Sequence, residues 1–310
     1  MKLVFMGTPD YAVNTLEALI AAGHNVAAVF AQPDKPVGRK HIITAPPVKV
    51  CAQKHGITVY QPNTLRDGKA EEILKEIAPD VIVVVAYGKI LPKEILEIPK
   101  YGCVNGHASL LPKYRGASPI QWCIVCGEKE TGVTAMLMDE GMDTGDILKT
   151  VETEIGAEET AEELFDRLSV ITAELLVNTL AELEKGNIIP IKQEEKASYA
   201  PIIKKEMAQL DFKNMTATEI HNAVRGYYSW PCAYFFLEGK RVKVIKAAVA
   251  GNTGARAGTV IKSDDGLVIA CKDGTAVELV TVQPEGSKPM TAKQMLCGRP
   301  IAQGTVIGCE

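Results

Sequence analysis

The chain has 310 residues, of which 46% are hydrophobic and 23% charged, a composition typical of a globular protein with room for two domains. Its formal net charge of −4 excludes the strongly basic field that marks a general nucleic-acid binder. Its apolar runs are all too short to cross a bilayer, and the first run is too short for a signal peptide. We therefore expect a cytoplasmic protein that acts as a monomer and has no membrane partner.

The first half of the chain alternates strand-like and helix-like segments. Strands are predicted at residues 2–6, 25–31, 81–85, 102–107 and 131–138, and helices at 11–22 and 69–77. The β-branched run at 81–85 is typical of a strand covered on both faces. The alternation predicts a doubly wound, largely parallel, Rossmann-like α/β sheet, in which ligands bind beyond the carboxyl ends of the strands. Gly7-Thr8-Pro9 lacks the other glycines of a dinucleotide-binding turn and is interpreted as an ordinary strand-to-helix turn.

The second half changes character. A long helix is predicted at 160–183, followed by a polar segment without clear periodicity at 187–205 and a short helix at 217–225. Short strands separated by turn signals follow at 233–237, 241–247, 258–261, 267–270 and 276–282. We expect a catalytic domain at 1–186, a linker at 187–205 and a small OB-like β-barrel domain at 206–310.

Asn105 and His107 form the core of the candidate site. They are two residues apart, so their side chains point to the same side of an extended strand. When an amine attacks a formyl carbon, the carbonyl oxygen gains negative charge, which the Asn105 amide and a protonated His107 could stabilise. A second group should then manage the proton of the amine. These residue types therefore indicate acyl transfer, although a core or surface histidine is the alternative for His107.

An acidic loop at 138–146 follows a predicted strand. Its carboxylates are those of Asp139, Glu140, Asp143 and Asp146. Asp143 is the candidate to orient His107 and to accept a proton through water. The residue chemistry alone does not choose among the four acids, and a solvated turn or a divalent-metal loop remains open, although the spacing does not match an EF-hand.

No metal site is expected. Cys123 and Cys126 form a C-x-x-C pair, but no second pair or histidine pair stands at ligand spacing. The pair lies in an apolar segment that is interpreted as a buried helix, so two buried thiols are expected instead.

The motif Asn-x-His-x-Ser-Leu-Leu-Pro-x-x-Arg-Gly, followed by Asp-x-Gly-x-Asp-Thr-Gly-Asp, resembles formyltransferases that use 10-formyltetrahydrofolate. The resemblance implies that Asn105, His107 and Asp143 are catalytic. It also implies that the folate donor is bound by a loop near Ala86-Tyr87-Gly88, whose residues are Ser109, Leu110, Leu111, Pro112 and Lys113.

Other segments resemble the branch of that family that formylates initiator methionyl-tRNA. They are the opening at residues 5–12, the loop at 32–40 with its continuation to 49, and the segments 220–226 and 230–231. The resemblance implies that the basic loop contacts tRNA, with Arg39 as first choice beside Lys40, and with Lys35 and Lys49 as further candidates. The barrel is a second expected contact surface on the tRNA.

Two positions depart from the family pattern. Gly106 stands where an aliphatic residue is usual and is expected to loosen the strand of the site, and Ser229 stands where a proline is common. Two rival functions remain open at this stage. One is a formyltransferase that acts on a small amine such as an amino sugar, and the other is a non-catalytic RNA-binding protein whose functional part is the barrel.

Overall fold

The structure is a computed structural model that describes residues 1–38, 41–194 and 196–308. These residues form two compact units. The N-terminal unit contains residues 1–119, 130–154 and 165–200, and the C-terminal unit contains residues 120–129, 155–164 and those from Pro201 onward. Among the helices of the described ranges, none is both long and apolar enough to cross a membrane. The domain limits expected from the sequence stay a prediction.

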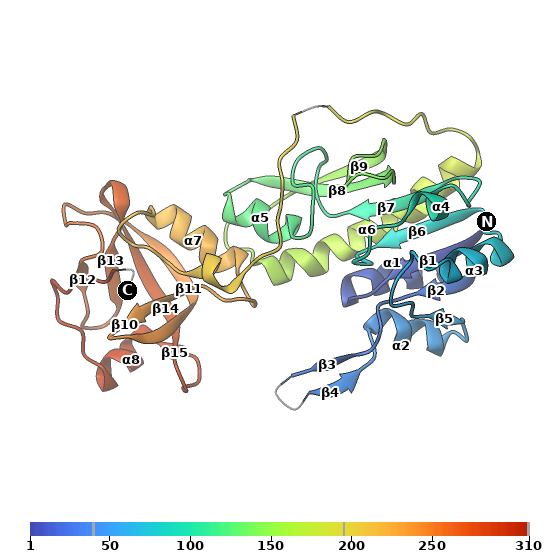
Figure 1. The fold of residues 1–310 in the computed structure, drawn as a ribbon. Helices are drawn as coiled ribbons and strands as arrows, with labels where there is room; N and C mark the ends of the chain where they lie inside the picture. The colour runs from blue at the N-terminus through green and yellow to red at the C-terminus, as the bar shows by residue number, and fades with distance from the viewer. Residues whose placement is uncertain (39–40, 195, 309–310) are drawn as a thin grey trace. The chain divides into compact units, whose positions relative to one another are not determined.

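A seven-stranded sheet forms the centre of the N-terminal unit, with strand order β5-β2-β1-β6-β7-β8-β9 (Figure 1). The strands from β5 to β7 run parallel, and β8 and β9 are antiparallel to their neighbours. The doubly wound, largely parallel sheet predicted from the sequence is therefore confirmed. The strands are β1 (Lys2–Gly7), β2 (Asn25–Phe30), β5 (Val59–Tyr60), β6 (Val81–Val85), β7 (Cys103–His107), β8 (Glu130–Leu137) and β9 (Ile147–Glu154).

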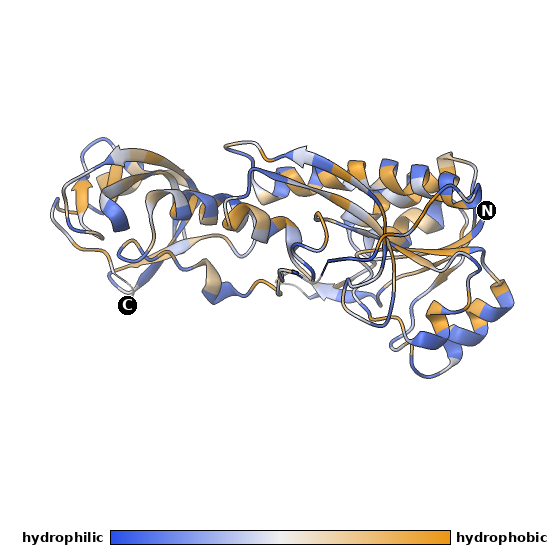
Figure 2. Cartoon of the chain, turned by 90° about the horizontal axis from the view of Figure 1, so that it is seen from above, coloured by the Kyte–Doolittle hydropathy of each residue, from blue (hydrophilic) through white to orange (hydrophobic). Residues whose placement is uncertain are grey.

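Helices cover both faces of this sheet. One face packs Ile82, Val84 and Cys103 into a cluster with Leu74 of α3 and Ile95 of α4. The other face is covered by α1 and α6. In Figure 2 the helices carry both hydrophobic and hydrophilic colours, as expected where one side of a helix faces the core. The helices of this unit are α1 (Asp10–Ala21), α2 (Pro47–Lys54), α3 (Lys69–Ile77), α4 (Lys93–Leu96) and most of α6 (Ala161–Glu184), whereas α5 (Pro119–Val125) belongs almost entirely to the C-terminal unit.

Gly106 lies near the carboxyl end of β7, where α6 comes close to the sheet. A Cβ atom at this position would stand 2.7 Å from Cγ2 of Thr172 and 2.9 Å from Cδ1 of Leu176. The glycine pairs with Ala135 of β8, so the strand is hydrogen-bonded normally at this point. The missing side chain therefore lets the helix approach the strand.

The C-terminal unit contains a curled antiparallel sheet with strand order β10-β11-β14-β13-β12, and β15 pairs with β14. This arrangement confirms the predicted small OB-like β domain. Its core contains mostly aliphatic residues with the aromatic pair Phe212 and Phe235, whose ring centroids are 5.6 Å apart. The elements are η1 (Lys205–Ala208), α7 (Ala217–Gly226), β10 (Tyr234–Leu237), β11 (Lys240–Asn252), β12 (Val260–Lys262), β13 (Leu267–Ala270), η2 (Lys272–Gly274), β14 (Thr275–Pro284), β15 (Met290–Thr291) and α8 (Ala292–Gly298).

The segment 220–226, which marked the family resemblance, lies on α7 and has a structural part in this unit. The buried Arg225 donates from Nη1 to the carbonyl oxygens of Gly156 and Glu159, at 3.2 and 3.0 Å. Its Nη2 donates to Oδ1 of Asn222 at 2.7 Å. Arg225 thus fastens α7 to the segment 155–164 of the same unit, and burial lowers the pKa of its guanidinium.

The close approach of α6 to β7 can be tested with Gly106→Val. We expect a loss of about 1–3 kcal/mol of unfolding free energy in urea titrations, because the added methyl groups meet Thr172 and Leu176 in a packed core. The double change with Leu176→Ala should be less destabilising than the sum of the two single changes. Gly254→Val is the control, because a Cβ at Gly254 meets nothing within 4 Å. A neutral Gly106→Val would show that the helix does not depend on this glycine.

Candidate active site

Asn105 and His107 lie at the carboxyl end of β7, on the face opposite Gly106. Both side chains are nearly buried, with exposed fractions of 9% and 7%. The strand is held on one side by β6, through the pair Val84 and Asn105, and on the other by β8, through the pair Thr134 and His107. The same-side arrangement predicted from the spacing of the two residues follows from this strand, whose neighbours fix its register on both sides.

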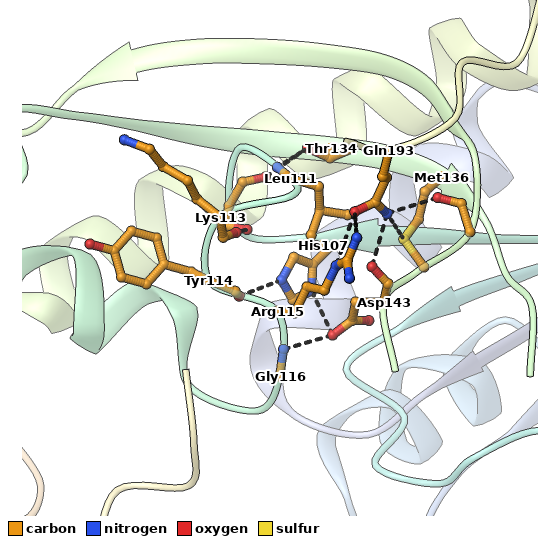
Figure 3. A network of polar contacts seen from close by, with 12 residues as sticks. His107, Leu111, Lys113, Tyr114, Arg115, Gly116, Thr134, Met136, Asp143 and Gln193 are labelled. Carbon is orange, nitrogen blue, oxygen red and sulfur yellow. Dashed lines mark hydrogen bonds and ion pairs between the residues drawn. The ribbon is translucent and has the colours of Figure 1, made fainter. Parts of the chain in front are cut away.

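The His107 ring is contacted at both nitrogens (Figure 3). Its Nε2 lies 3.0 Å from the carbonyl oxygen of Tyr114, and its Nδ1 lies 3.7 Å from Oδ2 of Asp143. Since a carbonyl oxygen only accepts hydrogen bonds, Nε2 carries a hydrogen and donates it. This leaves Nδ1 as the ring nitrogen that faces the Asp143 carboxylate.

Asp143 is the acid that the structure brings to His107. Its Oδ2 accepts a hydrogen bond of 2.8 Å from the N–H of Gly116, and its backbone φ of 54° lies in the left-handed region. Two other acids of the loop are engaged differently. Oδ1 of Asp139 accepts from Thr144 Oγ1 at 2.6 Å within the loop, and Glu140 lies at the surface, 4.0 Å from Lys93. The structure thus brings His107 and Asp143 together. Their catalytic roles stay a prediction.

The predicted folate loop, residues 109–113, turns back on itself beside β8. Ser109 Oγ donates to the carbonyl oxygen of Lys113 at 2.7 Å. Thr134 Oγ1 donates to the carbonyl oxygen of Ser109 at 2.7 Å and accepts from the N–H of Leu111 at 3.1 Å. These bonds hold the loop that follows His107 against β8. Whether it binds folate stays a prediction.

Part of the expected linker contributes to the same site, which the sequence reasoning missed. Ser198 Oγ accepts from the N–H of Tyr114 at 2.9 Å, and the Ser198 carbonyl oxygen accepts from the N–H of Arg115 at 2.9 Å. The N–H of Ala200 donates to the Arg115 carbonyl oxygen at 2.7 Å. The nearly buried Arg115 also donates from Nη2 to Gln193 Oε1 at 2.6 Å. Segment 193–200 has no periodic pattern, and the only sequence signal was the Arg-Gly pair that ends the first motif.

Two polar side chains of this unit have no hydrogen-bond partner among the described residues. Within the described part of the chain, the Asn105 amide makes no hydrogen bond, which leaves it open to a substrate. The same description gives no partner for the buried hydroxyl of Tyr87, and burial raises the pKa of that hydroxyl to about 12. The backbone of Tyr87 is fixed, because its carbonyl oxygen accepts from Thr8 Oγ1 and Gln32 Nε2 at 3.0 and 3.1 Å.

The predicted tRNA-contacting loop forms a hairpin of β3 (Lys35–Val37) and β4 (Ile42–Thr44). Arg39 and Lys40, the two residues expected to bind tRNA, lie outside the described residues. Lys49 donates to both carboxylate oxygens of Asp34 at 2.9 Å, and this contact lowers the pKa of the Asp34 carboxyl. Lys49 therefore braces the base of the loop in this structure, while Lys35 is exposed.

Among the described residues, one group of side chains has the atom types and spacing of a metal site. Glu17, Cys51 and His55 form one cluster whose ligand atoms lie within 4.8 Å of one another. They already bond to each other, since Cys51 Sγ donates to Glu17 at 3.2 Å and His55 Nε2 lies 2.8 Å from the same carboxylate.

Of the C-x-x-C pair, Cys123 is buried as expected. Cys126 is exposed, so the expectation of two buried thiols was wrong for Cys126, which directly follows the end of α5.

Comparison with known sequences assigns a class to this architecture. Residues 1–180 match the formyl transferase family, and residues 202–300 match the formyl transferase C-terminal domain. The methionyl-tRNA formyltransferase of Thermodesulfovibrio yellowstonii is 48% identical over 303 residues, which cover 97% of each chain. That of Caldanaerobacter subterraneus is 47% identical over 310 residues, which cover 99% of this chain and all of the relative. The chain therefore belongs to the formyltransferase family, in the group of the methionyl-tRNA formyltransferases.

Solved structures share the fold. An N-formyltransferase from Helicobacter canadensis, in complex with folinic acid and dTDP-3-aminofucose, superposes with a TM-score of 0.70 at 23% identity and covers 92% of this chain and 99% of that one. The methionyl-tRNA formyltransferase from Clostridium thermocellum superposes with a TM-score of 0.55 at 23% identity and covers 80% of this chain and 93% of that one.

The unpartnered hydroxyl of Tyr87 can be tested against a matched tyrosine. Tyr87→Phe should leave the unfolding free energy unchanged or slightly raised, because it removes a buried group that makes no hydrogen bond. The hydroxyl of the buried Tyr11 lies 2.6 Å from the Thr172 hydroxyl, so Tyr11→Phe should cost about 0.5–1.5 kcal/mol. Urea titrations measure both changes. A Tyr87→Phe protein that is as destabilised as the Tyr11→Phe protein would contradict the assignment.

Proposed function

We propose that this chain transfers a formyl group from 10-formyltetrahydrofolate to the α-amine of initiator methionyl-tRNA, in the cytoplasm and at the start of translation. The observation that carries the proposal is the arrangement at the end of β7, where the Asn105 amide lies on the same face as a His107 ring whose Nδ1 faces Asp143, and where the amide makes no hydrogen bond to the described residues. The methionyl-tRNA formyltransferase that is 48% identical over nearly its full length supports methionyl-tRNA as the acceptor. The folinic acid in the complex of the Helicobacter canadensis enzyme supports a folate as the donor.

Direct transfer needs stabilisation of one developing charge. The amine nitrogen attacks the formyl carbon, a C–N bond forms, and the carbonyl oxygen becomes an oxyanion. The Asn105 amide N–H and the N–H of a protonated His107 donate to that oxyanion. When the intermediate collapses, the bond to N10 of the folate breaks and N10 takes up a proton. The formyl carbon has the same oxidation level before and after transfer, so no step requires a redox cofactor, and the route uses no metal ion.

Asp143 has two tasks in this route. Its carboxylate stabilises the positive charge on the His107 ring, and it receives the proton that the attacking amine releases. The 3.7 Å between Asp143 Oδ2 and His107 Nδ1 exceeds the length of a direct hydrogen bond. A water molecule therefore fits the role of relay between the amine and the carboxylate.

The choice of acceptor separates this proposal from a small-amine formyltransferase. The Helicobacter canadensis enzyme, whose complex contains an amino sugar, superposes with a TM-score of 0.70, but its sequence is only 23% identical to this chain. The full-length identity of 48% favours methionyl-tRNA. Arg39 and Lys40 supply the phosphate contacts in this proposal, and the C-terminal barrel supplies a second tRNA surface. A purely RNA-binding role is disfavoured, because it does not account for the arrangement of Asn105, His107 and Asp143.

The oxyanion role of Asn105 predicts the outcome of Asn105→Ala. We expect kcat for formylation of methionyl-tRNA to fall by about 10²–10³-fold, the usual effect of removing one oxyanion donor. Thermal stability should hardly change, since the amide has no partner in the described residues whose bond could be lost. Single-turnover assays with the folate donor measure the step. An undiminished rate, or a parent protein without formyl transfer, would rule out the catalytic proposal.

The role of Arg39 predicts a loss that depends on the acceptor. Arg39→Ala should lower kcat/KM for methionyl-tRNA steeply and make the remaining rate less sensitive to salt, because a phosphate contact is removed. Arg66→Ala removes an exposed arginine from the same unit and should leave both unchanged. A small-amine enzyme would hardly respond to either change. Equal rates for the two variants would therefore favour the small-amine alternative.

A further inference from the structure

The side chain of Gln193 lies between the acidic loop and the loop that follows His107 (Figure 3). Its Nε2 donates to the carbonyl oxygens of Asp143 and Gly145, at 2.9 and 2.8 Å. Its Oε1 accepts from Nε and Nη2 of Arg115, at 3.1 and 2.6 Å. Both N–H groups and both lone pairs of the amide are thus in use, which is the full capacity of a glutamine side chain.

The backbone that Gln193 holds needs outside support. Asp143 has a φ of 54°, a conformation that costs a non-glycine residue free energy. Gly145 packs so closely that a Cβ atom there would overlap the carbonyl oxygen of Leu137. The two hydrogen bonds from Gln193 fall on the carbonyls of Asp143 and Gly145 themselves. If this turn relaxed, the Asp143 carboxylate would leave both the Gly116 N–H and the His107 ring.

Arg115 fixes the other end of the amide. Arg115 is 9% exposed, and the two contacts of its guanidinium with Gln193 Oε1 are charge-assisted. The positive charge of Arg115 draws electron density toward Oε1, and this makes the Nε2 hydrogens better donors to the two carbonyl oxygens. The residues on either side of Arg115 are Tyr114, which accepts from His107, and Gly116, which donates to Asp143. One side chain thus links the two loops that set the separation of His107 and Asp143.

We infer that Gln193 is a positioning residue for formyl transfer, which keeps the Asp143 carboxylate opposite His107 by holding the backbone of the acidic loop. Gln193 acts through Asp143, and its effect on the rate rests on the function proposed above. It belongs to the segment expected to be a linker, so this part of the segment has a task in the site beyond joining two domains.

The first experiment compares Gln193→Ala with Glu194→Gln, a change at the exposed neighbouring side chain. We expect Gln193→Ala to lower kcat about 10- to 100-fold, because displacing a catalytic group by about an ångström has that effect. KM for methionyl-tRNA and for the folate donor should stay within about twofold, because the Gln193 amide is fully engaged by groups of the chain itself. Gln193→Glu preserves the shape and the Arg115 contact but places a carboxylate oxygen against two carbonyls. It should not restore the rate, whereas a residue that only fills space would tolerate it.

A double-mutant cycle separates positioning from general stability. If Gln193 acts through Asp143, Gln193→Ala should change kcat by less than about twofold in an Asp143→Ala protein. Equal losses in both backgrounds, or an unchanged kcat in Gln193→Ala, would overturn the inference while leaving the proposed function intact.

Hydrogen exchange of the amides of residues 143–146 gives a readout without activity. The inference predicts faster exchange there in Gln193→Ala than in the parent and Glu194→Gln proteins. Unchanged exchange would overturn the inference. If the parent does not formylate methionyl-tRNA, the proposed function fails, and faster exchange would still support Gln193 as the residue that holds the loop.

Discussion

The His107 ring is positioned by groups of two loops. Residues that lie far from both loops in the sequence hold these loops in place. The carbonyl oxygen of Tyr114 fixes one nitrogen at 3.0 Å, and the Asp143 carboxylate faces the other at 3.7 Å. Asp143 is itself oriented by the N–H of Gly116. Because the partner groups belong to the main chain of Tyr114 and Gly116, a change of the Tyr114 side chain removes neither group. Movement of either loop would displace these groups, and Gln193, Ser198 and Ala200 are the residues that bond to the loops.

The strand that carries the site is constrained from its other face. Asn105 and His107 alternate with Gly106, which faces Thr172 and Leu176 of α6. The helix approaches so closely that its side chains occupy the space of a Cβ atom. The strand is also hydrogen-bonded on both sides, so its freedom is limited in the plane of the sheet and perpendicular to it. The absence of a side chain at Gly106 therefore lets the strand contact a buried helix. This packing offsets the loosening of the strand that was expected of a glycine.

The sequence predicted what periodic burial and local spacing determine. The run at 81–85 indicated a central strand, and the i, i+2 spacing of Asn105 and His107 placed both on one face, because a strand alternates its sides. Four acids in one loop could not be distinguished, since the choice depends on a turn that gives Asp143 a φ of 54°. Gln193 could not be found at all. Its partners are backbone carbonyls and an arginine far along the chain, and such contacts leave no pattern in the sequence.

Under the proposed function, chemistry and acceptor choice belong to different parts of the chain. Formyl transfer needs only an amine nitrogen near the donor and groups that stabilise an oxyanion, and the fold is shared with an N-formyltransferase from Helicobacter canadensis at a TM-score of 0.70. The acceptor must then be selected away from His107. Lys49 is already paired with Asp34, so the proposal assigns the phosphate contacts of the basic loop to Arg39 and Lys40. Phosphate contacts weaken with salt, whereas the nearly buried groups around His107 are far less screened. Added salt should therefore act on acceptor binding while leaving the transfer step largely unchanged.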